Sequence, residues 1–169
     1  MTPKRIYIHH SADSSTKPQF EKINTYHRIK FNMISSLGLY GGYNKLIEKD
    51  GTIETYRKDG EETTAQKGDN KEALSVCLSG HFDTEYPNKA QVETLQGLLS
   101  DWMNKYQITN ENVHGHRFIG NTSCPGKNIT DLNIRTWANG AGQLTALQKI
   151  IDELKKQVEE LMRKLGLKK

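Results

Sequence analysis

The histidine and cysteine residues of this chain fall in two short segments whose spacing could hold a metal ion. The first, I-Y-I-H-H-S-A-D, contains His9 and His10. The second, H-G-H-R-F-I-G-N-T-S-C-P-G, spans residues 114–126, and in it Cys124 follows His116 by eight residues. Donors from both segments would give zinc three protein ligands, and sites with three protein ligands keep a position for water, whereas structural sites use four. The pattern therefore points to a zinc hydrolase.

Strand geometry distinguishes the two histidines of the first segment. Residues 5–9 read as a short strand, in which neighbouring side chains point to opposite faces of the sheet. Ile6 and Ile8 share the face of His10, and we expect that face to pack on the core. His9 then projects from the other face and is the better ligand. A pair of solvated histidines is the alternative interpretation of the same residues.

The second segment leaves more alternatives open. His114 and His116 share a face, so alternation does not choose between them. The interval to Cys124 can bring a thiolate and an imidazole onto one ion, and thiolate is a ligand that suits zinc. A structural loop with an incidental cysteine and a cysteine–histidine nucleophilic enzyme are the alternatives. Pro125 and Gly126 argue against the nucleophile, because no helix N-terminus directly follows the cysteine.

Bulk properties narrow the class of protein. The chain of 169 residues can bury one core and carry an appendage, and its 34% hydrophobic and 26% charged content is ordinary for a soluble globular protein. Its net charge is +4, and residues 144–169 supply +3 of it, with seven Lys and Arg against four Asp and Glu. The rest has no basic stripe, so we expect no nucleic-acid partner. We also expect no membrane span and no signal peptide, because the N-terminus turns polar after three apolar residues.

The apolar pattern predicts interleaved strands and helices. Strands are expected at residues 5–9, 43–47, 52–56, 74–78 and near 113, and helices at about 18–34, 90–106 and 131–137. Asp50 and Gly51 predict a hairpin turn, and residues 57–72 a polar surface loop. Cys77 lies in an apolar run, which indicates a buried thiol rather than a disulfide partner for Cys124. A mixed central β-sheet flanked by helices, an α/β fold, fits this order.

The C-terminal part has a different pattern. We expect a globular domain over residues 1–139, a glycine-containing linker at 140–143 and a helix at 144–169. Apolar residues recur at heptad spacing at Leu144, Leu147, Ile151, Leu154, Val158, Leu161 and Leu165. This helix either packs on its own domain or forms a homo-oligomer through residues 144–165. A basic membrane-surface helix is a third alternative, which the interspersed acidic residues disfavour.

Four sequence blocks together resemble one known family. They are I-H-H-S-A, G-Y-N-K-L-I-E-K-D-G-T-I-E, L-S-V-C-L-S-G-H-F and G-H-R-F-I-G-N-T-S-C-P-G. Their order and intervals resemble the zinc-dependent N-acetylmuramoyl-L-alanine amidases of the amidase-2 family, which includes phage lysozyme-type amidases and peptidoglycan recognition proteins. The resemblance covers about residues 5–137, and it implies a mixed central sheet with helices on its faces.

The resemblance also implies roles for particular residues. By position, the zinc ligands of the family fall on His9, His116 and Cys124. The catalytic tyrosine falls on Tyr43, and the position two before the ligand cysteine is Thr122. Both hydroxyl groups are then candidate donors to the oxyanion that forms during amide hydrolysis.

The sequence departs from the family pattern in two places. Asn44 stands where many members carry histidine, and Ala65 stands where some members carry histidine in the loop. These changes leave the ligands intact and affect the expected contacts with substrate. His27 matches a common histidine of the family, for which we expect a structural role.

The implied activity is zinc-dependent hydrolysis of the bond between N-acetylmuramic acid and L-alanine in peptidoglycan. A phage or prophage endolysin, made in the cytoplasm without a signal peptide and acting on the wall after release, is the expected setting. A bacterial wall-recycling amidase is the alternative. Two further alternatives are a recognition module that binds peptidoglycan without cleaving it and a coiled-coil assembly protein with a degenerate domain.

Overall fold

Five strands and their helices occur in the order that the sequence predicts. The computed structural model of the chain describes residues 2–165, except the side chains of residues 141–146, 148 and 149. The elements are β1 (Arg5–His10), α1 (Phe20–Phe31), β2 (Lys45–Ile47), β3 (Ile53–Thr55), β4 (Ala73–Leu78), α2 (Lys89–Tyr106), η1 (Asn110–Asn112), β5 (Val113–Gly115), η2 (His116–Phe118) and α3 (Asp131–Lys164). The expected α/β fold is confirmed.

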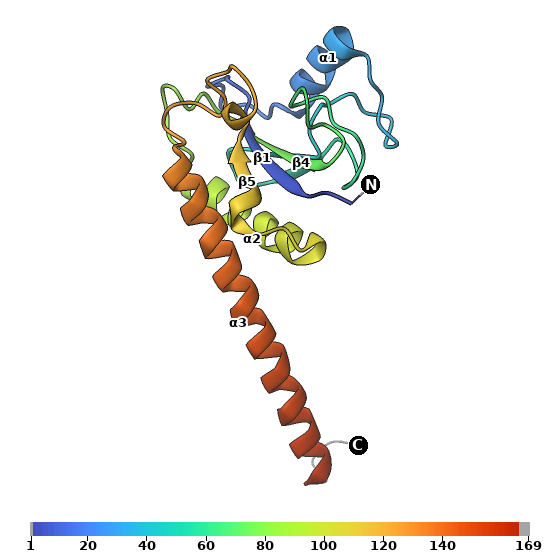
Figure 1. Cartoon of the computed structure of the whole chain (residues 1–169), viewed down its shortest axis with the longest axis vertical. Coiled ribbons are helices and arrows are strands. Elements are labelled where there is room, and N and C mark those ends of the chain that lie inside the picture. The colour runs from blue at the N-terminus through green and yellow to red at the C-terminus, as the bar shows by residue number, and fades with distance from the viewer. Residues whose placement is uncertain (1, 166–169) are drawn as a thin grey trace.

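The sheet is mixed, with strand order β3-β2-β4-β1-β5. The four strands β2, β4, β1 and β5 run parallel, and only β3 is antiparallel, because the turn at Asp50 and Gly51 returns it directly beside β2. Strand β1 lies between β4 and β5, so its carboxyl end is flanked by the ends of both neighbours. In Figure 1, α1 lies at this end of the sheet.

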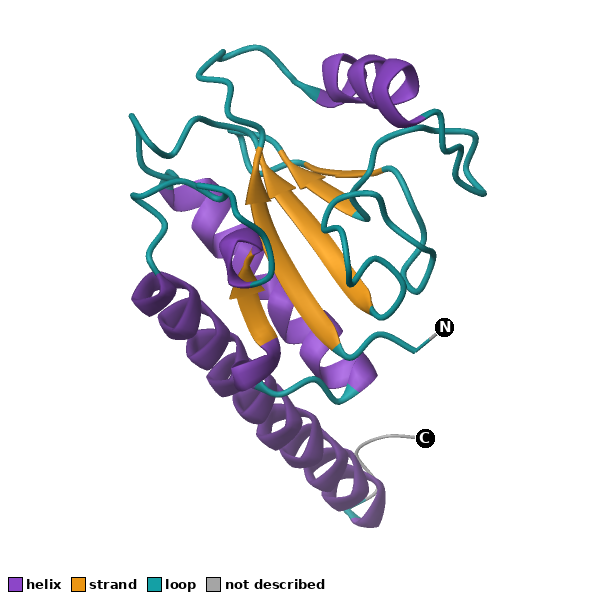
Figure 2. Cartoon of the chain, turned by 45° about the horizontal axis from the view of Figure 1, so that its top comes forward, coloured by secondary structure: helices purple, strands orange, loops and turns teal. Residues whose placement is uncertain are grey.

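The main core lies between the sheet and the helices α2 and α3, on the side of the sheet away from α1 (Figure 2). Ile6 and Ile8 of β1 face this core and are fully buried, as alternation predicts. From the helices, Leu95, Leu99 and Trp102 of α2 and Ile134 and Trp137 of α3 pack against them. The face of β1 that carries the two isoleucines therefore packs against α2 and α3.

A second, smaller core lies under α1. Phe20 of α1 stacks on buried Tyr56 and packs against the cluster that contains buried Cys77, which is a free thiol, as expected. Glu48, which directly follows β2, accepts hydrogen bonds from the backbone N–H groups of Gln19 (2.7 Å) and Phe20 (3.0 Å). A carboxylate at the start of a helix satisfies unpaired N–H groups and complements the helix dipole. Glu48 thus fixes α1 against the end of the sheet.

The structure corrects the expected linker. One continuous helix, α3, runs through residues 140–143, in place of a short helix ending at 137 and a separate C-terminal one. At Gly140 a Cβ atom would lie 2.8 Å from Nε2 at the end of the Gln96 side chain, so α3 passes close to α2 at this glycine. Packing outweighs the roughly 1 kcal/mol that a glycine costs a helix interior.

The division into residues 1–139 and 144–169 stays a prediction. Of the expected tail, the side chain of Leu144 and residues 166–169 lie outside what the structure describes. Within residues 2–165, no helix is long and apolar enough to cross a membrane.

Candidate metal centre

Three side chains from distant parts of the chain meet at the carboxyl end of β1. The donor atoms of His9, His116 and Cys124 all lie within 4.8 Å of one another. Nδ1 of His9 lies 3.7 Å from Sγ of Cys124, and the ring centroids of His9 and His116 are 4.6 Å apart. The structure therefore brings together the three residues that the sequence assigns to a zinc site.

The neighbouring histidines have other surroundings. His10 lies on the opposite face of β1, where its Nδ1 accepts a hydrogen bond from the backbone N–H of Phe82 (3.2 Å). His114 lies within β5, and its ring stacks on Phe118 at 3.7 Å between centroids. The chain leaves β5 after Gly115 and enters a 3-10 turn at His116. This change of direction separates the two histidines, which strand alternation alone could not do.

A glutamine fixes the orientation of the His9 ring. Nε2 of Gln66 donates to Oγ1 of Thr63 (3.2 Å) and to the backbone carbonyl of Asp69 (3.3 Å). Its Oε1 accepts from the Ser75 hydroxyl (2.6 Å) and faces Nε2 of His9 at 3.2 Å. Because the glutamine presents an acceptor, Nε2 of His9 carries the proton and Nδ1 carries the lone pair. That lone pair lies on the side of the Cys124 thiol.

The protonation states of His9, His116 and Cys124 suit a set of metal ligands better than a cysteine nucleophile. Burial, followed by the proximity of His116, lowers the pKa of His9 well below its usual value, and burial lowers the pKa of His116. Both rings are therefore neutral and can ligate. Burial within the protein raises the pKa of the Cys124 thiol to about 12. A cysteine nucleophile needs a lowered pKa, whereas a coordinated cation deprotonates a thiol. This donor set fits a zinc site of three protein ligands.

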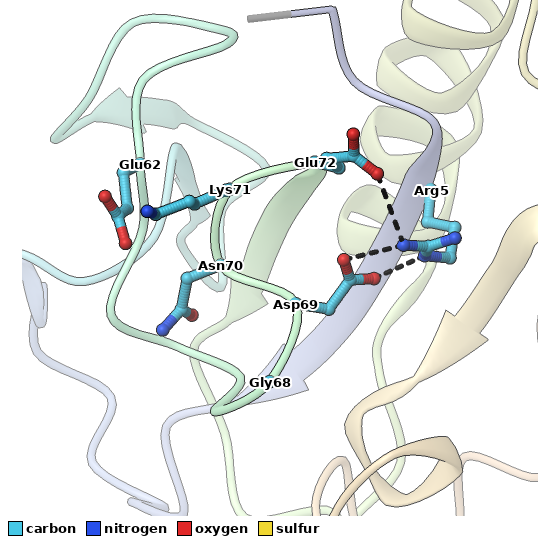
Figure 3. A pocket seen from close by; sticks show the side chains of 7 residues that line it. All are labelled: Arg5, Glu62, Gly68, Asp69, Asn70, Lys71 and Glu72. Atoms are coloured by element: carbon cyan, nitrogen blue, oxygen red, sulfur yellow. Dashed lines mark hydrogen bonds and ion pairs between the residues drawn. The ribbon is translucent and has the colours of Figure 1, made fainter.

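The loop that carries Gln66 is anchored to β1 by an ion pair (Figure 3). Nη2 of Arg5 donates to Oδ1 of Asp69 (2.7 Å), Nε of Arg5 donates to Oδ2, and the Tyr7 hydroxyl also donates to Oδ2 (2.9 Å). Burial alone would raise the pKa of Asp69, but the hydrogen bonds from Arg5 and Tyr7 outweigh it and lower the pKa. Tyr7 shares the face of His9, so one face of β1 both supplies a candidate ligand and holds the loop that orients it.

The Cys124 loop is shaped by backbone hydrogen bonds. The N–H of Arg117 donates to the carbonyl of Cys124 (2.9 Å), and the N–H of Cys124 donates to Oγ1 of Thr122 (3.2 Å). Gly126 has φ +99°, and a Cβ there would lie 2.5 Å from the carbonyl carbon of Phe82. Only glycine tolerates both conditions. Thr122 therefore lies beside Cys124 and contacts its backbone.

Tyr43 lies against His9, with ring centroids 5.1 Å apart. His27 of α1 supports it from the other side at 5.4 Å, and its Nδ1 accepts from the N–H of Gly42 (2.7 Å). Burial, and then the neighbouring thiols, raise the pKa of Tyr43 well above its usual value. The phenol is therefore a hydrogen-bond donor at neutral pH. His27 holds the backbone before Tyr43 through this hydrogen bond and also lines the pocket beside the three donors, and its structural role stays a prediction.

Two buried polar residues support the site in ways that the sequence did not predict. The Arg57 guanidinium is fully buried, and its Nε donates to the carbonyl of Gly41 (2.8 Å), two residues before Tyr43. Asn44 donates through Nδ2 to the carbonyl of Lys58 (2.9 Å) and accepts from the N–H of Ser75 (2.8 Å). Asn44 is thus a structural bridge and not a substrate contact.

The three donors open onto a pocket of about 390 Å³. Helix α1 contributes Tyr26, Lys30 and Phe31 to its wall, and the loop after β3 contributes Thr64 and Ala65. Tyr43 and Thr122 also line it. Ala65 presents a methyl group where some members of the resembled family have a histidine. The pocket can hold a small part of a substrate directly beside the donor atoms.

Comparison with known proteins identifies the class to which this fold and site belong. The model of the N-acetylmuramoyl-L-alanine amidase family, Amidase_2, matches residues 1–127. All three donor residues and Tyr43 lie within the matched region. The chain belongs to this family.

Individual relatives fall into two groups. The chain is 37% identical over 142 residues to peptidoglycan-recognition protein SC2 of Drosophila melanogaster, covering 78% of this chain and 72% of the relative. It is 28% identical over 134 residues to the endolysin of Enterobacteria phage T3, covering 73% and 81%. Among solved structures, N-acetylmuramoyl-L-alanine amidase LysC from Clostridium intestinale URNW is similar, with TM-score 0.69, 32% identity, and coverage of 82% of this chain and 86% of that one.

Proposed function

We propose that this protein hydrolyses the amide bond between the lactyl group of N-acetylmuramic acid and L-alanine in peptidoglycan, with zinc held by His9, His116 and Cys124. The convergence of these donors within 4.8 Å on the wall of a pocket carries the proposal. Membership of the amidase family and the similarity to LysC support the substrate.

Gln66, Tyr43 and Thr122 have different roles at the zinc site. When bound at such a site, zinc lowers the pKa of a coordinated water to about 7 and polarises a carbonyl oxygen. Gln66 holds His9 in the tautomer whose Nδ1 can ligate. Tyr43 and Thr122 are the predicted donors to the oxygen of the scissile carbonyl as it gains negative charge. Thr122 already accepts from the N–H of Cys124, and this uses a lone pair and leaves the O–H for the substrate.

Chemical analysis of digested cell walls tests the proposal. Purified peptidoglycan incubated with the protein and zinc is expected to gain free amino groups on L-alanine and no new reducing sugar ends. The Cys124→Ser variant keeps the side-chain volume and removes the thiolate ligand, so it serves as the matched inactive control. Release of reducing ends alone, or full activity of Cys124→Ser, contradicts the proposal.

A recognition role without hydrolysis is the second candidate, and the 37% identity to a peptidoglycan-recognition protein favours it. The two functions differ in one assay. A recognition module sediments with insoluble peptidoglycan but releases no L-alanine amino groups when loaded with zinc. An amidase sediments with peptidoglycan and also releases them.

The biological setting that we propose is that of a phage endolysin, supported by the similarity to the phage T3 enzyme. In that setting the protein is made in the cytoplasm and reaches the wall after a separate pore-forming protein opens the membrane. Expression in bacteria is then expected to cause lysis only with a co-expressed pore former. A wall-recycling amidase would cause no lysis in either case.

A further inference from the structure

The distal part of α3 carries an apolar stripe that its own domain does not cover. Six apolar side chains at heptad spacing are 44–70% exposed: Leu147, Ile151, Leu154, Val158, Leu161 and Leu165. This part of the helix extends away from the sheet and from α2 (Figure 1). Monomeric proteins rarely expose a continuous apolar stripe of this length. We call these six residues the seam.

The composition of the seam selects one type of partner. We infer that it is the interface of a parallel, two-stranded coiled coil between two copies of this chain. Its spacing of three and four places Ile151, Val158 and Leu165 at a positions and Leu147, Leu154 and Leu161 at d positions. The two inner a positions, Ile151 and Val158, are β-branched and every d position is leucine, a combination that favours two parallel strands over trimers and tetramers.

Flanking charges favour the parallel orientation. In a parallel pair, each g residue meets the e residue five positions later on the other copy. The pairs with both members inside residues 147–165 are Ile150 with Lys155 and Gln157 with Met162, and neither brings like charges together. An antiparallel pair with full overlap of the seam would place Lys155 beside Lys155 of the other copy. Self-repulsion at the centre of the seam therefore disfavours the antiparallel arrangement.

Two other occupants fit the structure less well. Because α3 is continuous from the part packed on α2 to the seam, the seam cannot fold back onto its own domain without breaking the helix (Figure 2). A membrane surface would favour a basic polar face, but here Asp152, Glu153, Glu159 and Glu160 alternate with Lys155, Lys156 and Arg163. Pairing with a second copy of the chain requires neither a break in α3 nor a basic polar face.

A parallel pair would place both metal centres at the same end of the coiled coil. If the protein acts on peptidoglycan as proposed above, two linked sites would bind one polymer with raised effective concentration and without new contacts. The seam itself does not depend on that function, and its test below uses mass and cross-linking rather than activity.

Sedimentation equilibrium of the full chain tests the pairing. We expect twice the 19.2 kDa mass of one chain. Leu154→Glu, which places a carboxylate at the centre of the seam, is expected to give the monomer mass. Lys156→Glu makes a larger change of charge on the opposite side of the helix and is expected to keep the dimer. A monomeric or trimeric full chain, or a dimeric Leu154→Glu variant, overturns the inference.

A cysteine cross-link tests the orientation. In a parallel pair, two a residues face each other across the axis, whereas an antiparallel pair places a opposite d. Under oxidised glutathione, Val158→Cys is expected to form a disulfide-linked dimer in a non-reducing gel, beyond any formed by the parent chain. Lys156→Cys, on the outer side, is the matched control. Equal cross-linking of the two variants, or none in Val158→Cys, overturns the parallel arrangement.

Discussion

The two faces of β1 are formed by alternate residues of one short strand and have different roles. Ile6 and Ile8 face the core between the sheet and the helices α2 and α3, where they are fully buried by apolar neighbours. Tyr7 and His9 are also buried, but they face hydrogen-bonding partners from the loop at residues 57–72. Both faces are therefore buried, but one face contacts apolar side chains and the other contacts hydrogen-bonding groups.

This difference has a physical consequence. Hydrophobic burial is non-directional and depends on area and volume, so the apolar face tolerates changes that preserve packing. Hydrogen bonds and metal ligation depend on distance and angle, so the polar face tolerates little. Substitutions on the apolar face should change the free energy of unfolding, and substitutions on the polar face should change zinc affinity and turnover.

The largest expected effect follows from removing a ligand on the polar face. His9→Ala is expected to abolish stoichiometric zinc binding and peptidoglycan hydrolysis, because two donors remain of three. His114→Ala, which removes a histidine outside the ligand group, is the control and should keep both. Metal content by atomic emission and release of L-alanine amino groups measure the two effects. Loss of zinc in His114→Ala and not in His9→Ala would reverse the assignment.

On the apolar face, Ile8→Ala should act through stability. Truncating a fully buried isoleucine costs about 2–5 kcal/mol, because both transfer free energy and packing are lost. Urea unfolding followed by circular dichroism measures this loss. Under conditions where the variant is folded, it should still bind one zinc per chain. A variant with native stability that has lost its zinc would show that the two faces are not separable.

Gln66 sharpens the comparison because it contacts the metal centre only through His9. Gln66→Leu should weaken zinc binding by about 10–100-fold, the usual effect of removing a partner of a metal-ligating histidine. Gln66→Glu keeps an oxygen facing His9 and should lose less. Competition with a zinc-binding dye measures the affinity. Unchanged affinity in Gln66→Leu would mean that the ring of His9 is held by packing alone.

Tyr43→Phe should leave zinc content unchanged and lower turnover by about tenfold or more, since loss of one oxyanion donor costs on the order of 10²–10³ in other enzymes. Thr122→Ala should have the milder effect. Steady-state hydrolysis of a soluble muramyl peptide separates kcat from KM. Wild-type turnover in Tyr43→Phe would remove this residue from the catalytic group.

The smallest effect concerns the anchor of the loop. The folded-state pKa of Asp69 lies below its unfolded value, so the Arg5–Asp69 interaction contributes stability above pH of about 4 and loses it as the pH falls through the folded pKa. Asp69→Asn should therefore be less stable than the wild type at pH 7, and the difference should shrink at pH 3. Urea unfolding at both values checks this. A difference that grows on acidification contradicts the role of the ion pair.

The apolar pattern predicted the fold well because it reports directly on burial. Alternation in β1 placed Ile6 and Ile8 on the core and His9 opposite them, and both placements are confirmed. The interval from His116 to Cys124 predicted the ligand group, although the choice between His114 and His116 rested on family resemblance. Heptad spacing likewise identified the apolar stripe of α3.

Features that depend on partners distant in sequence could not be predicted. Gln66 lies in a loop without periodicity, and its role is visible only when the loop packs on β1. Arg57 and Asn44 are polar residues whose hydrogen-bond partners lie elsewhere in the chain, and both are buried. The linker expected at residues 140–143 was wrong because local glycine content does not reveal the packing of Gly140 against α2.

Zinc stoichiometry in the full chain tests the central claim most directly. Protein purified and then dialysed against a strong chelator should lose its activity on peptidoglycan, and titration with zinc should restore the activity with an end point at one zinc per chain. Cys124→Ser should show no such end point under the same conditions. Full activity after exhaustive chelation, or an equal end point in Cys124→Ser, would contradict the account of His9, His116 and Cys124 as a catalytic zinc site.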